Sequence, residues 1–576
     1  MEAMNAKSAN QVSRRSFLKG GALLAGTMAA AGALAGCAPQ RGGDKEGLAS
    51  TAAADGSWDK ETDIVVVGSG TVAVAAMAAS AYGAKVIVLE KTNMFGGTTI
   101  FSGQGMGIPL CHVHGEQAAA DTLEDVLGYY RTASGSRADL AVGEAYAING
   151  DKFITWLEET YGMTFGFAMG QNFYGDYYDP CKGYLGVGRN PINVTAIEGE
   201  EEGTTAWAYF NKRILSDENC ELLLETPALS LVTDETGRVA GVIANDGKSD
   251  IRIKANKAVV LGTGGFEHNA DMRRQYLSMP IMAACSCEGN TGDGQKMGMK
   301  VGADVAYMDR CWGLPHVYIG DKEPLDMLAN NEILPSISGT GDVFQDPGMY
   351  RGLPGSVIVN SLGHRIGNEG ASYDTFNRSF GVFNSDLNTM PNLKSFLIFD
   401  STYVPAFGAF PGANEDGTLP SGYVQADTLE ELADKLGIEK EAFLQEMEAF
   451  NANAEKGVDP QFHRGEHEFE NNTSIGYMAM AGQDISGNNP VLTPLKTAPF
   501  YGVKMLSGTF GTNGGLRVDA NSQVLSVDGN PIEGLYAVGN CSSGVAGGIY
   551  AHGGFTVGSG AVMSWVAVRH ILGVEG

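Results

Sequence analysis

Cysteine is scarce in this chain and forms no recognisable motif. Eight cysteines are spread over 576 residues, without a C-x-x-C pair, a C-x-x-C-H haem-attachment motif or the spacing of a zinc site. Cys285 and Cys287 lie too close in sequence to suggest an ordinary disulfide, and we expect buried thiols instead. These absences argue against haem, iron–sulfur and zinc ligation, and we predict no metal site.

The chain also has few basic residues relative to acidic ones. Lys and Arg total 39 against 67 Asp and Glu, which gives a formal net charge of −28. Without residues 1–36, which hold four bases and one acid, the formal charge is −31. A chain this acidic repels nucleic acid, and we expect the charge mainly to favour solubility.

The apolar segment near the start of the chain is too weak for a permanent membrane span. It runs from Gly20 to Gly36 and consists mainly of Gly and Ala, with little Leu or Ile. A twin-arginine pattern, SRRSFLK, precedes it at residues 13–19. We therefore predict that residues 1–36 are an export signal, cut where LAGC at residues 34–37 resembles a bacterial lipobox.

This signal predicts where the protein resides. Cys37 becomes the acylated first residue, and residues 37–59, rich in Gly, Ala and Ser, form a tether. We expect export by the twin-arginine route and a lipid anchor at the extracytoplasmic face of the cell membrane, with no other membrane contact. The alternative is a plain signal cleaved nearby, with Cys37 incidental.

The stretch from Asp63 to Lys91 organises the rest of the chain. It reads as a β-branched strand, a glycine turn, an Ala-rich helix and a second strand over residues 85–89 that ends at an acid. Ile64 to Val67 is uninterrupted and apolar, which is typical of a parallel strand buried on both faces. We therefore predict a βαβ unit here.

The glycine turn has the spacing G-x-G-x-x-A, formed by Gly68, Gly70 and Ala73. The first glycine allows a tight turn, the second lets a pyrophosphate approach, and the small third residue lets the helix pack close to the strand. Glu90 is placed to accept hydrogen bonds from an adenosine ribose. The unit predicts a dinucleotide site, although a glycine turn in some other α/β protein is the alternative.

Glycines and small hydroxyl residues also follow Lys91, in the stretch Gly96 to Gly103. Such residues let the backbone pass against a large flat ligand and offer short donors to it. With this stretch the chain resembles the two-dinucleotide-type FAD domain of the fumarate reductase and 3-ketosteroid dehydrogenase superfamily. The resemblance covers most of residues 60–576 and includes segments 261–266, 290–294 and 534–540.

The resemblance implies an α/β fold. Its Rossmann-like FAD-binding domain is discontinuous, because the last segment returns to the flavin, and an α+β capping domain is inserted in it. We predict the first FAD part over residues 60–315, the cap over 316–495 and the second FAD part over 496–576. Within the cap, the apolar spacing from Leu429 to Asn453 predicts one packing helix.

The resemblance also implies which residues bind FAD. They are small residues and a few polar side chains at the ends of predicted strands: Gly68, Gly70, Ala73, Glu90, Lys91, Gly96, Gly97, Thr98, Thr99, Ser102, Gly103, Thr263, Gly264, Gly265, Asp293, Gly539 and Asn540.

The residue that follows the Asn368-Glu369 pair indicates the branch of the superfamily. In fumarate reductases an arginine stands a few residues later and protonates the substrate, whereas this chain has Tyr373. The arrangement N-E-x-x-x-Y resembles the 3-ketosteroid dehydrogenases, where this tyrosine handles the proton on the carbon next to the carbonyl. The alternative is a core tyrosine whose hydroxyl is merely satisfied.

Further segments resemble the same branch. Tyr550 and Gly554 match a tyrosine and a glycine that hydrogen-bond the substrate carbonyl, and His552 between them departs from the family's pattern. His552 replaces, assists or only neighbours that role. Tyr177 matches a further active-site tyrosine, although aromatic clusters of this kind are often the wall of a pocket.

These parts suit hydride transfer between FAD and a C=C or CH–CH bond beside a carbonyl. Donors at the carbonyl oxygen and a tyrosine at the neighbouring carbon are what this chemistry needs. We therefore expect an oxidoreductase that acts on an enone or ketosteroid-like substrate.

The direction of the reaction follows from the electron partner. No NAD(P)-binding unit is visible, and the anchor brings the protein within reach of membrane donors, so we favour reduction. The expected donor is a separate membrane cytochrome or quinone-linked protein. Three alternatives stay open: reduction of a small unsaturated carboxylate held by Arg351 and Arg365, a non-catalytic flavin lipoprotein, and an amino-acid oxidase.

Overall fold

The computed structural model describes residues 57–116, 121–168, 191–336, 341–406, 410–414, 417–467 and 469–574. They belong to the second of two compact units of the chain, residues 50–576. The predicted signal and Cys37 lie outside the described residues, and so does Tyr177.

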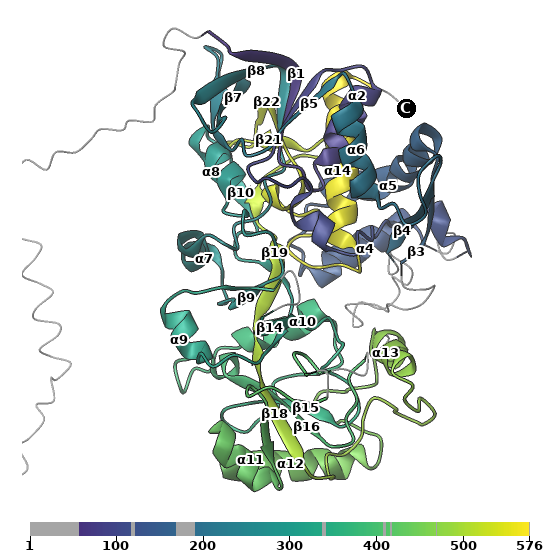
Figure 1. Ribbon diagram of the computed structural model, residues 1–576, viewed down its shortest axis with the longest axis vertical. Coiled ribbons are helices and arrows are strands. Elements are labelled where there is room, and N and C mark those ends of the chain that lie inside the picture. The colour runs from purple at the N-terminus through teal and green to yellow at the C-terminus, as the bar shows by residue number, and fades with distance from the viewer. Residues whose placement is uncertain are drawn as a thin grey trace, which may run out of the picture. The chain divides into compact units, whose positions relative to one another are not determined.

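The first sheet holds eight strands in the order β21-β22-β8-β1-β2-β5, with β7 paired to β8 and β6 to β7 (Figure 1). The bounds are β1 Lys60–Val67, β2 Val86–Leu89, β5 Cys220–Leu223, β6 Ala228–Thr233, β7 Val239–Asn245, β8 Asp250–Leu261, β21 Gln523–Leu525 and β22 Pro531–Ala537.

Parallel pairing in this sheet brings distant segments together. β1 pairs with β2 and with β8, and β22 pairs with β8, so that Val66 lies between Val88 and Val260. Ile64 to Val66 are wholly buried, as the uninterrupted β-branched run predicts. Because these strands are parallel, their carboxyl ends meet at one edge, where α/β proteins bind ligands.

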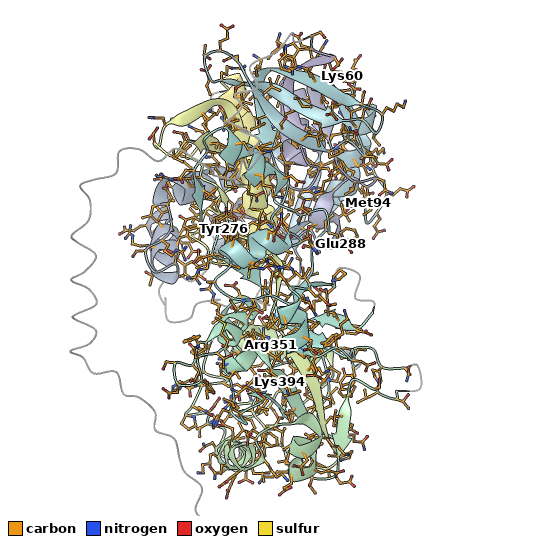
Figure 2. The ribbon with its side chains drawn as sticks, turned by 90° about the vertical axis from the view of Figure 1, so that its left-hand side faces the viewer. Lys60, Met94, Tyr276, Glu288, Arg351 and Lys394 are labelled. Atoms are coloured by element: carbon orange, nitrogen blue, oxygen red, sulfur yellow. The ribbon has the colours of Figure 1, made fainter. Side chains whose placement is uncertain are left out.

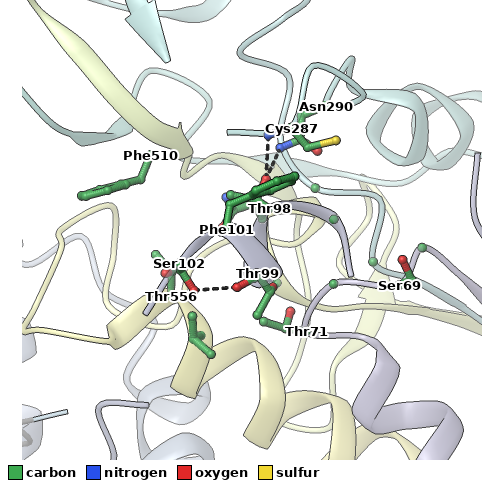
Figure 3. A pocket seen from close by; sticks show the side chains of 18 of the residues that line it. Ser69, Thr71, Thr98, Thr99, Phe101, Ser102, Cys287, Asn290, Phe510 and Thr556 are labelled. Carbon is green, nitrogen blue, oxygen red and sulfur yellow. Dashed lines mark hydrogen bonds between the residues drawn. The ribbon is translucent and has the colours of Figure 1, made fainter. Parts of the chain in front are cut away.

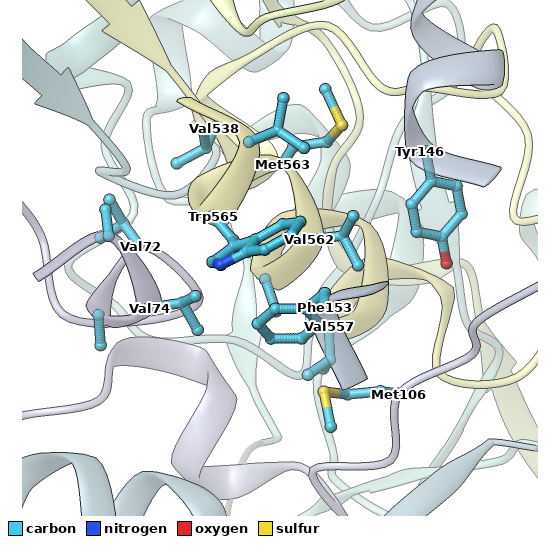
Figure 4. Close-up of a cluster of buried hydrophobic side chains, with 14 of the residues drawn as sticks. Val72, Val74, Met106, Tyr146, Phe153, Val538, Val557, Val562, Met563 and Trp565 are labelled. Atoms are coloured by element: carbon cyan, nitrogen blue, oxygen red, sulfur yellow. The ribbon is translucent and has the colours of Figure 1, made fainter. Parts of the chain in front are cut away.

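Helices cover this sheet, and two of them form the centre of its core. Figure 4 shows Val72 and Val74 at the start of one helix close to Val562 and Trp565 of the last helix. The bounds are α2 Ala73–Ala81, α4 Leu123–Ala133, α5 Leu140–Tyr161, α6 Ala206–Ser216, α7 Ala270–Tyr276, α8 Asp293–Lys300 and α14 Phe555–Leu572. A short hairpin of β3 Met163–Phe167 and β4 Ile192–Ile197 lies beyond them.

Helix α14 is long and apolar enough to cross a membrane by length and composition alone. Its residues are instead largely buried against α2 and α5, with Ala561, Ala567 and Val568 wholly inaccessible to solvent. The apolar character of this helix is therefore explained by the core that it fills.

The second large sheet belongs to the predicted cap. Its strands follow the order β14-β12-β18-β16-β15, with β17 paired to β18. The bounds are β12 His316–Tyr318, β14 Val343–Gln345, β15 Ser356–Asn360, β16 Ser395–Asp400, β17 Val424–Ala426 and β18 Phe500–Leu506. Figure 2 places Arg351 and Lys394 in this part and Lys60 with the first sheet. β18 lies after the predicted cap boundary at residue 495.

Both faces of the cap sheet are buried. Along β16, Leu397 and Phe399 pack into one apolar cluster, whereas Phe396 and Ile398 pack into another. The second cluster includes apolar side chains of the helices α11 Leu429–Leu436 and α12 Lys440–Ala454. This alternation is the two-residue period of a strand. Other cap helices are α9 Pro324–Ala329, α10 Tyr373–Asn377 and α13 Ile475–Met480.

The single helix predicted over residues 429–453 is wrong in one respect. The structure has α11 Leu429–Leu436 and α12 Lys440–Ala454, separated at Gly437. Gly437 takes the left-handed conformation, with φ +67°, and its N–H bonds the carbonyls of Ala433 and Asp434. Glycine at this position ends a helix readily, so the apolar spacing continues through a break in the backbone.

A third sheet joins the two parts of the chain. It has the order β11-β19-β9-β13, built from β9 Ala283–Ala284, β11 Cys311–Gly313, β13 Leu334–Pro335 and β19 Gly508–Thr512. Only Ser507 separates β19 from β18, so one extended segment runs from the cap sheet into this smaller sheet (Figure 1). A two-stranded sheet of β10 Val305–Ala306 and β20 Gly515–Leu516 follows. The α/β fold class predicted from the sequence is confirmed.

Candidate active site

A cavity of about 430 Å³ opens at the carboxyl edge of the first sheet. Its lining includes the residues that directly follow β1, β2 and β8 and those that begin two residues after β22, and it extends to side chains of the cap. Figure 3 shows side chains that line it, among them Thr71, Thr98, Thr99, Phe101 and Phe510. The chain thus folds distant sequence segments around one space.

The first glycine of the predicted turn is required by a close approach of two backbone segments. Gly68 has φ +105°, and a Cβ atom there would lie 2.3 Å from the carbonyl oxygen of Gly262. Gly70 also lines the cavity, and Gly97 packs against its Cα atom. No larger residue fits at position 68 while β1 and β8 keep this spacing.

Glu90 lies at the end of β2 with its carboxylate fixed by hydrogen bonds. The Ser69 hydroxyl donates to one oxygen at 2.5 Å, and the N–H and hydroxyl of Thr92 donate to the other at 2.9 Å. The side chain is buried and lines the cavity. This position is the one expected of a ribose-binding acid.

Lys91 and Asp293 form an ion pair at the same end of the cavity. Lys91 Nζ lies 2.7 Å from Asp293 Oδ2 and donates to the Thr291 hydroxyl at 3.0 Å. Within the described lining, the charged side chains are these two and Glu90. The remaining wall there is neutral.

Most of the predicted cofactor residues line this one cavity. They are Gly68, Gly70, Glu90, Lys91, Gly97, Thr98, Thr99, Ser102, Gly103, Thr263, Gly264, Asp293, Gly539 and Asn540. Three others lie behind it. Ala73 begins α2, Gly96 donates its N–H to the Ser69 hydroxyl at 2.7 Å, and a Cβ on Gly265 would collide with Glu267 and Thr512. These three shape the wall without reaching the cavity.

A buried acid behind the cavity wall, Glu267, has no local signal in the sequence. Glu267 is wholly buried and accepts a hydrogen bond from Asn290 Nδ2 at 2.7 Å and from the Thr512 N–H at 3.1 Å. Asn290 also donates to the Thr98 hydroxyl at 3.2 Å and lines the cavity. Glu267 therefore ties together three segments whose contact no local pattern reveals.

Two of the predicted catalytic residues meet in the wall of the same cavity. The rings of Tyr373 and Tyr550 lie 5.3 Å apart at an interplanar angle of 66°, and both rings line the space. Phe510 completes the group, 5.6 Å from Tyr373 and 6.3 Å from Tyr550. Tyr373 is the first residue of α10, whose N-cap is Ser372.

The hydroxyl of Tyr550 is held in a hydrogen-bonded group. Burial raises its pKa, whereas hydrogen bonds from the Tyr373 and Thr556 hydroxyls and from the Gly554 N–H act in the opposite direction. Gly554 has φ +69° and is the N-cap of α14, so the positive end of that helix dipole lies here. The site is therefore built to meet negative charge on an oxygen.

His552 does not belong to the cavity lining. It is buried, its Nδ1 atom lies 3.2 Å from the Gly553 carbonyl oxygen, and its Nε2 atom has no partner in the described part of the chain. Burial lowers the pKa of this imidazole to about 4, so it is neutral at pH 7. His552 is therefore next to the site and outside its lining, and any part that it takes in the chemistry stays a prediction.

The side chains of Arg351 and Arg365 both bind groups within the cap. Arg351 is buried and donates to the carbonyl oxygens of Glu369 and Ala371 at 2.6 Å. Arg365 pairs with Glu369 and with Asp459 at 2.6 and 2.9 Å. Neither arginine lines the cavity, so neither is placed to hold a substrate carboxylate.

Comparison with known proteins identifies the architecture. The chain matches the family described as FAD binding domain over residues 63–557. The chain belongs to the FAD-binding-2 family. The residues of the site suit FAD. The Glu90 carboxylate is placed for its ribose. The close backbone approach at Gly68 and the N-termini of α2, α8 and α14 beside the cavity suit its negative pyrophosphate.

Relatives of this FAD-binding-2 protein are named as dehydrogenases and reductases. The chain is 31% identical over 89% of its length to 4-oxocyclohexanecarboxylate 2-dehydrogenase of Sinomonas cyclohexanicum, covering 93% of that protein. It is 29% identical over 89% of its length to 3-oxosteroid 1-dehydrogenase of Mycolicibacterium smegmatis, covering 97% of it. It is 26% identical to digoxin reductase of Eggerthella lenta over 98% of this chain and 97% of that protein.

Solved structures show the same fold. The chain superimposes on 3-ketosteroid delta1-dehydrogenase of Sterolibacterium denitrificans with a TM-score of 0.71, at 24% identity, over 90% of this chain and 100% of that one. The protein is an FAD-dependent oxidoreductase acting on CH–CH groups, and this excludes the non-catalytic flavin carrier.

Proposed function

We propose that this protein transfers hydride between FAD and a carbon–carbon bond next to a carbonyl of a ketosteroid-like enone. The observation that carries the proposal is the cluster of Tyr373, Tyr550 and Gly554 in the wall of the FAD cavity. Bound FAD supplies or accepts the hydride, and the protein supplies everything that the substrate oxygen and the neighbouring carbon need.

The carbonyl oxygen is met by two donors. The Tyr550 hydroxyl and the Gly554 N–H lie within hydrogen-bond reach of each other, so a carbonyl oxygen placed between them can accept from both. The N-terminus of α14 adds its positive dipole at the same place. Together they stabilise the negative charge that develops on an enolate oxygen, which makes the far carbon of the enone electrophilic.

The proton is assigned to Tyr373. Its ring lies against Tyr550, and its hydroxyl bonds the Tyr550 hydroxyl, so a carbonyl bound at Tyr550 brings the adjacent carbon to Tyr373. A tyrosine with an ordinary pKa near 10 holds a proton at neutral pH and can donate it to that carbon. In the opposite direction the same hydroxyl group accepts the proton. Tyr177 stays a prediction for a further active-site tyrosine.

The wall of the cavity supports a neutral substrate. Among the described lining residues, the only cation is Lys91, and it is paired with Asp293. A small dicarboxylate needs cations at both ends, and Arg351 and Arg365 are committed to the cap. The aromatic group of Phe510, Tyr373 and Tyr550 instead offers a flat apolar surface to a ring system.

We further propose that the protein works as an exported, lipid-anchored reductase supplied by a membrane cytochrome or a quinone-linked protein. The twin-arginine and lipobox patterns at residues 13–19 and 34–37 support export. The similarity to digoxin reductase supports the direction, because that relative is named as a reductase.

The test follows reoxidation of the flavin. The purified protein loaded with FAD is reduced without oxygen and mixed with ketosteroid enones, simple aromatic enones, urocanate or fumarate. We expect reoxidation by enones and none by fumarate. Reoxidation by fumarate alone would contradict the assignment of Tyr373, and peroxide release in air with amines as substrates would indicate an amino-acid oxidase.

A further inference from the structure

The cap side of the cavity carries a hydrogen-bonded pair of side chains that the proposed chemistry does not use. Cys285 Sγ donates to Gln345 Oε1 at 3.3 Å, and both residues line the cavity. Cys285 directly follows β9, whereas Gln345 is the last residue of β14 in the cap sheet. The pair therefore joins two sheets at the wall of the substrate space.

This pair continues the row of aromatic side chains. β9 runs parallel to β19, with Ala284 opposite Thr509, and the Cys285 N–H donates to the Thr509 carbonyl oxygen at 2.8 Å. Cys285 consequently lies beside Phe510, since strands in a sheet are about 4.8 Å apart. Phe510 in turn contacts Tyr373. The order along the wall is Tyr550, Tyr373, Phe510, Cys285 and Gln345.

The Gln345 side-chain amide has a hydrogen-bond donor that is not used within the described residues. Its Oε1 atom is occupied by Cys285, and its Nε2 group has no hydrogen-bond partner in the part of the chain that the structure describes. Pro347 and Phe510 provide apolar surface in the same lining. An amide N–H group facing an apolar ligand would lose its hydrogen bonds to water, which is costly unless the ligand offers an acceptor.

We infer that Gln345 determines specificity by donating a hydrogen bond from Nε2 to a second, neutral acceptor of the substrate, remote from the reacting carbonyl. Cys285 is the positioning residue that holds the amide with Nε2 free. The inference rests on the proposed function and narrows its substrate class to enones with a carbonyl or hydroxyl oxygen at the opposite end.

Gln345→Met tests the inference, because methionine has a similar shape and no N–H group. Two ligands are used on the holoenzyme: a ketosteroid enone with a second carbonyl on its far ring, and the same steroid without that carbonyl. Isothermal titration calorimetry gives the dissociation constants. We expect the wild type to prefer the first ligand by about threefold to tenfold, as one hydrogen bond provides. In Gln345→Met the preference disappears, because only the first ligand binds more weakly.

Controls separate specificity from folding. Gln425 is exposed on β17, away from the cavity, so Gln425→Leu keeps the preference. Flavin content and the melting temperature of Gln345→Met are measured alongside, and Gln345→Leu is used if the first variant loses flavin. An unchanged preference in a flavin-loaded variant at position 345 would overturn the inference.

The role of Cys285 has its own signature. Cys285→Ala should raise the KM for the dicarbonyl steroid and leave kcat unchanged, whereas Cys285→Ser keeps a donor and restores the KM. Equal KM values in the wild type, Cys285→Ala and Cys285→Ser would show that Cys285 does not position the Gln345 amide. If neither steroid binds the wild type or reoxidises its flavin, the proposed substrate class itself is wrong. If both bind equally well and react, only the inference about Gln345 is wrong.

Discussion

Single side chains decide which chemistry the cavity can carry. The replacement of an arginine by Tyr373 was readable in the sequence, and the structure puts that tyrosine against Tyr550 in the cavity wall. Arg351 and Arg365, which made a carboxylate substrate an alternative, instead bind a carbonyl oxygen and a carboxylate within the cap. A residue type therefore indicates chemistry only once its partners are known.

Tyr373→Phe should abolish most of the activity without weakening ligand binding. The substitution removes only the hydroxyl that is proposed to move the proton, and losing such a group costs about 100-fold or more in rate. Rapid mixing of the reduced variant with an enone measures the rate, and calorimetry measures the affinity. The matched control is Tyr403→Phe, which removes a buried hydroxyl bonded to the Tyr350 carbonyl oxygen outside the cavity. Wild-type turnover in Tyr373→Phe would show that another group carries the proton.

Glu470 should make the stability of the protein depend on pH. Burial raises the pKa of this carboxyl to about 7, against the lowering effects of the Gly465 N–H, His467, the Asn368 amide and Arg464. Between its ordinary value of 4.5 and about 7, the folded protein holds a proton that the unfolded chain releases. The free energy of unfolding therefore falls as pH rises through this window, by roughly 1–3 kcal/mol.

Denaturant unfolding at pH 5 and pH 8 measures this change. In Glu470→Gln the side chain has no proton to lose, so the decrease attributed to this residue should vanish. Glu448 is exposed on α12, and Glu448→Gln should keep the wild-type pH dependence. An identical pH dependence in Glu470→Gln and the wild type would refute the assignment.

Elements show how far local sequence determines structure. The strand, glycine turn, helix and second strand of residues 63–91 were predicted, because buried β-branched runs and glycine spacing are local signals. The break at Gly437 had a local signal too, which the apolar periodicity concealed. The meeting of Cys285, Gln345 and Phe510 had none, since it depends on β9 pairing with a strand more than 200 residues away in sequence.

Gly68→Ala should lose FAD. The new Cβ atom would lie 2.3 Å from the Gly262 carbonyl oxygen, so β1 and β8 have to separate beneath the cofactor. We expect the ratio of flavin to protein after purification, read from the visible and ultraviolet absorbance, to fall severalfold. Gly83→Ala is the matched control, because Gly83 also has a positive φ, +81°, but meets no atom within 4 Å. It should carry the backbone strain alone and keep its flavin, and flavin loss in both variants would assign the effect to strain.

At the scale of the whole molecule, the predicted anchor concerns a part of the chain outside the described residues. If Cys37 is acylated, cells fed a labelled fatty acid should label the wild type and not Cys37→Ser. Arg14→Lys combined with Arg15→Lys should leave the unprocessed precursor inside the cell, since the twin-arginine route reads that pair. Labelled Cys37→Ser protein would place the lipid elsewhere, and both measurements leave the flavin chemistry untouched.

The cavity takes its walls from both ends of the described chain, from Gly68 after β1 to Val557 in α14. A ribosome that has made the glycine turn still has almost all of the polypeptide to synthesise before Tyr550 and Gly554 exist. Cofactor uptake is therefore a late event in the life of each molecule, and a chain broken off during synthesis has no place to retain flavin. A preparation of incomplete chains should therefore lack the yellow colour of bound flavin.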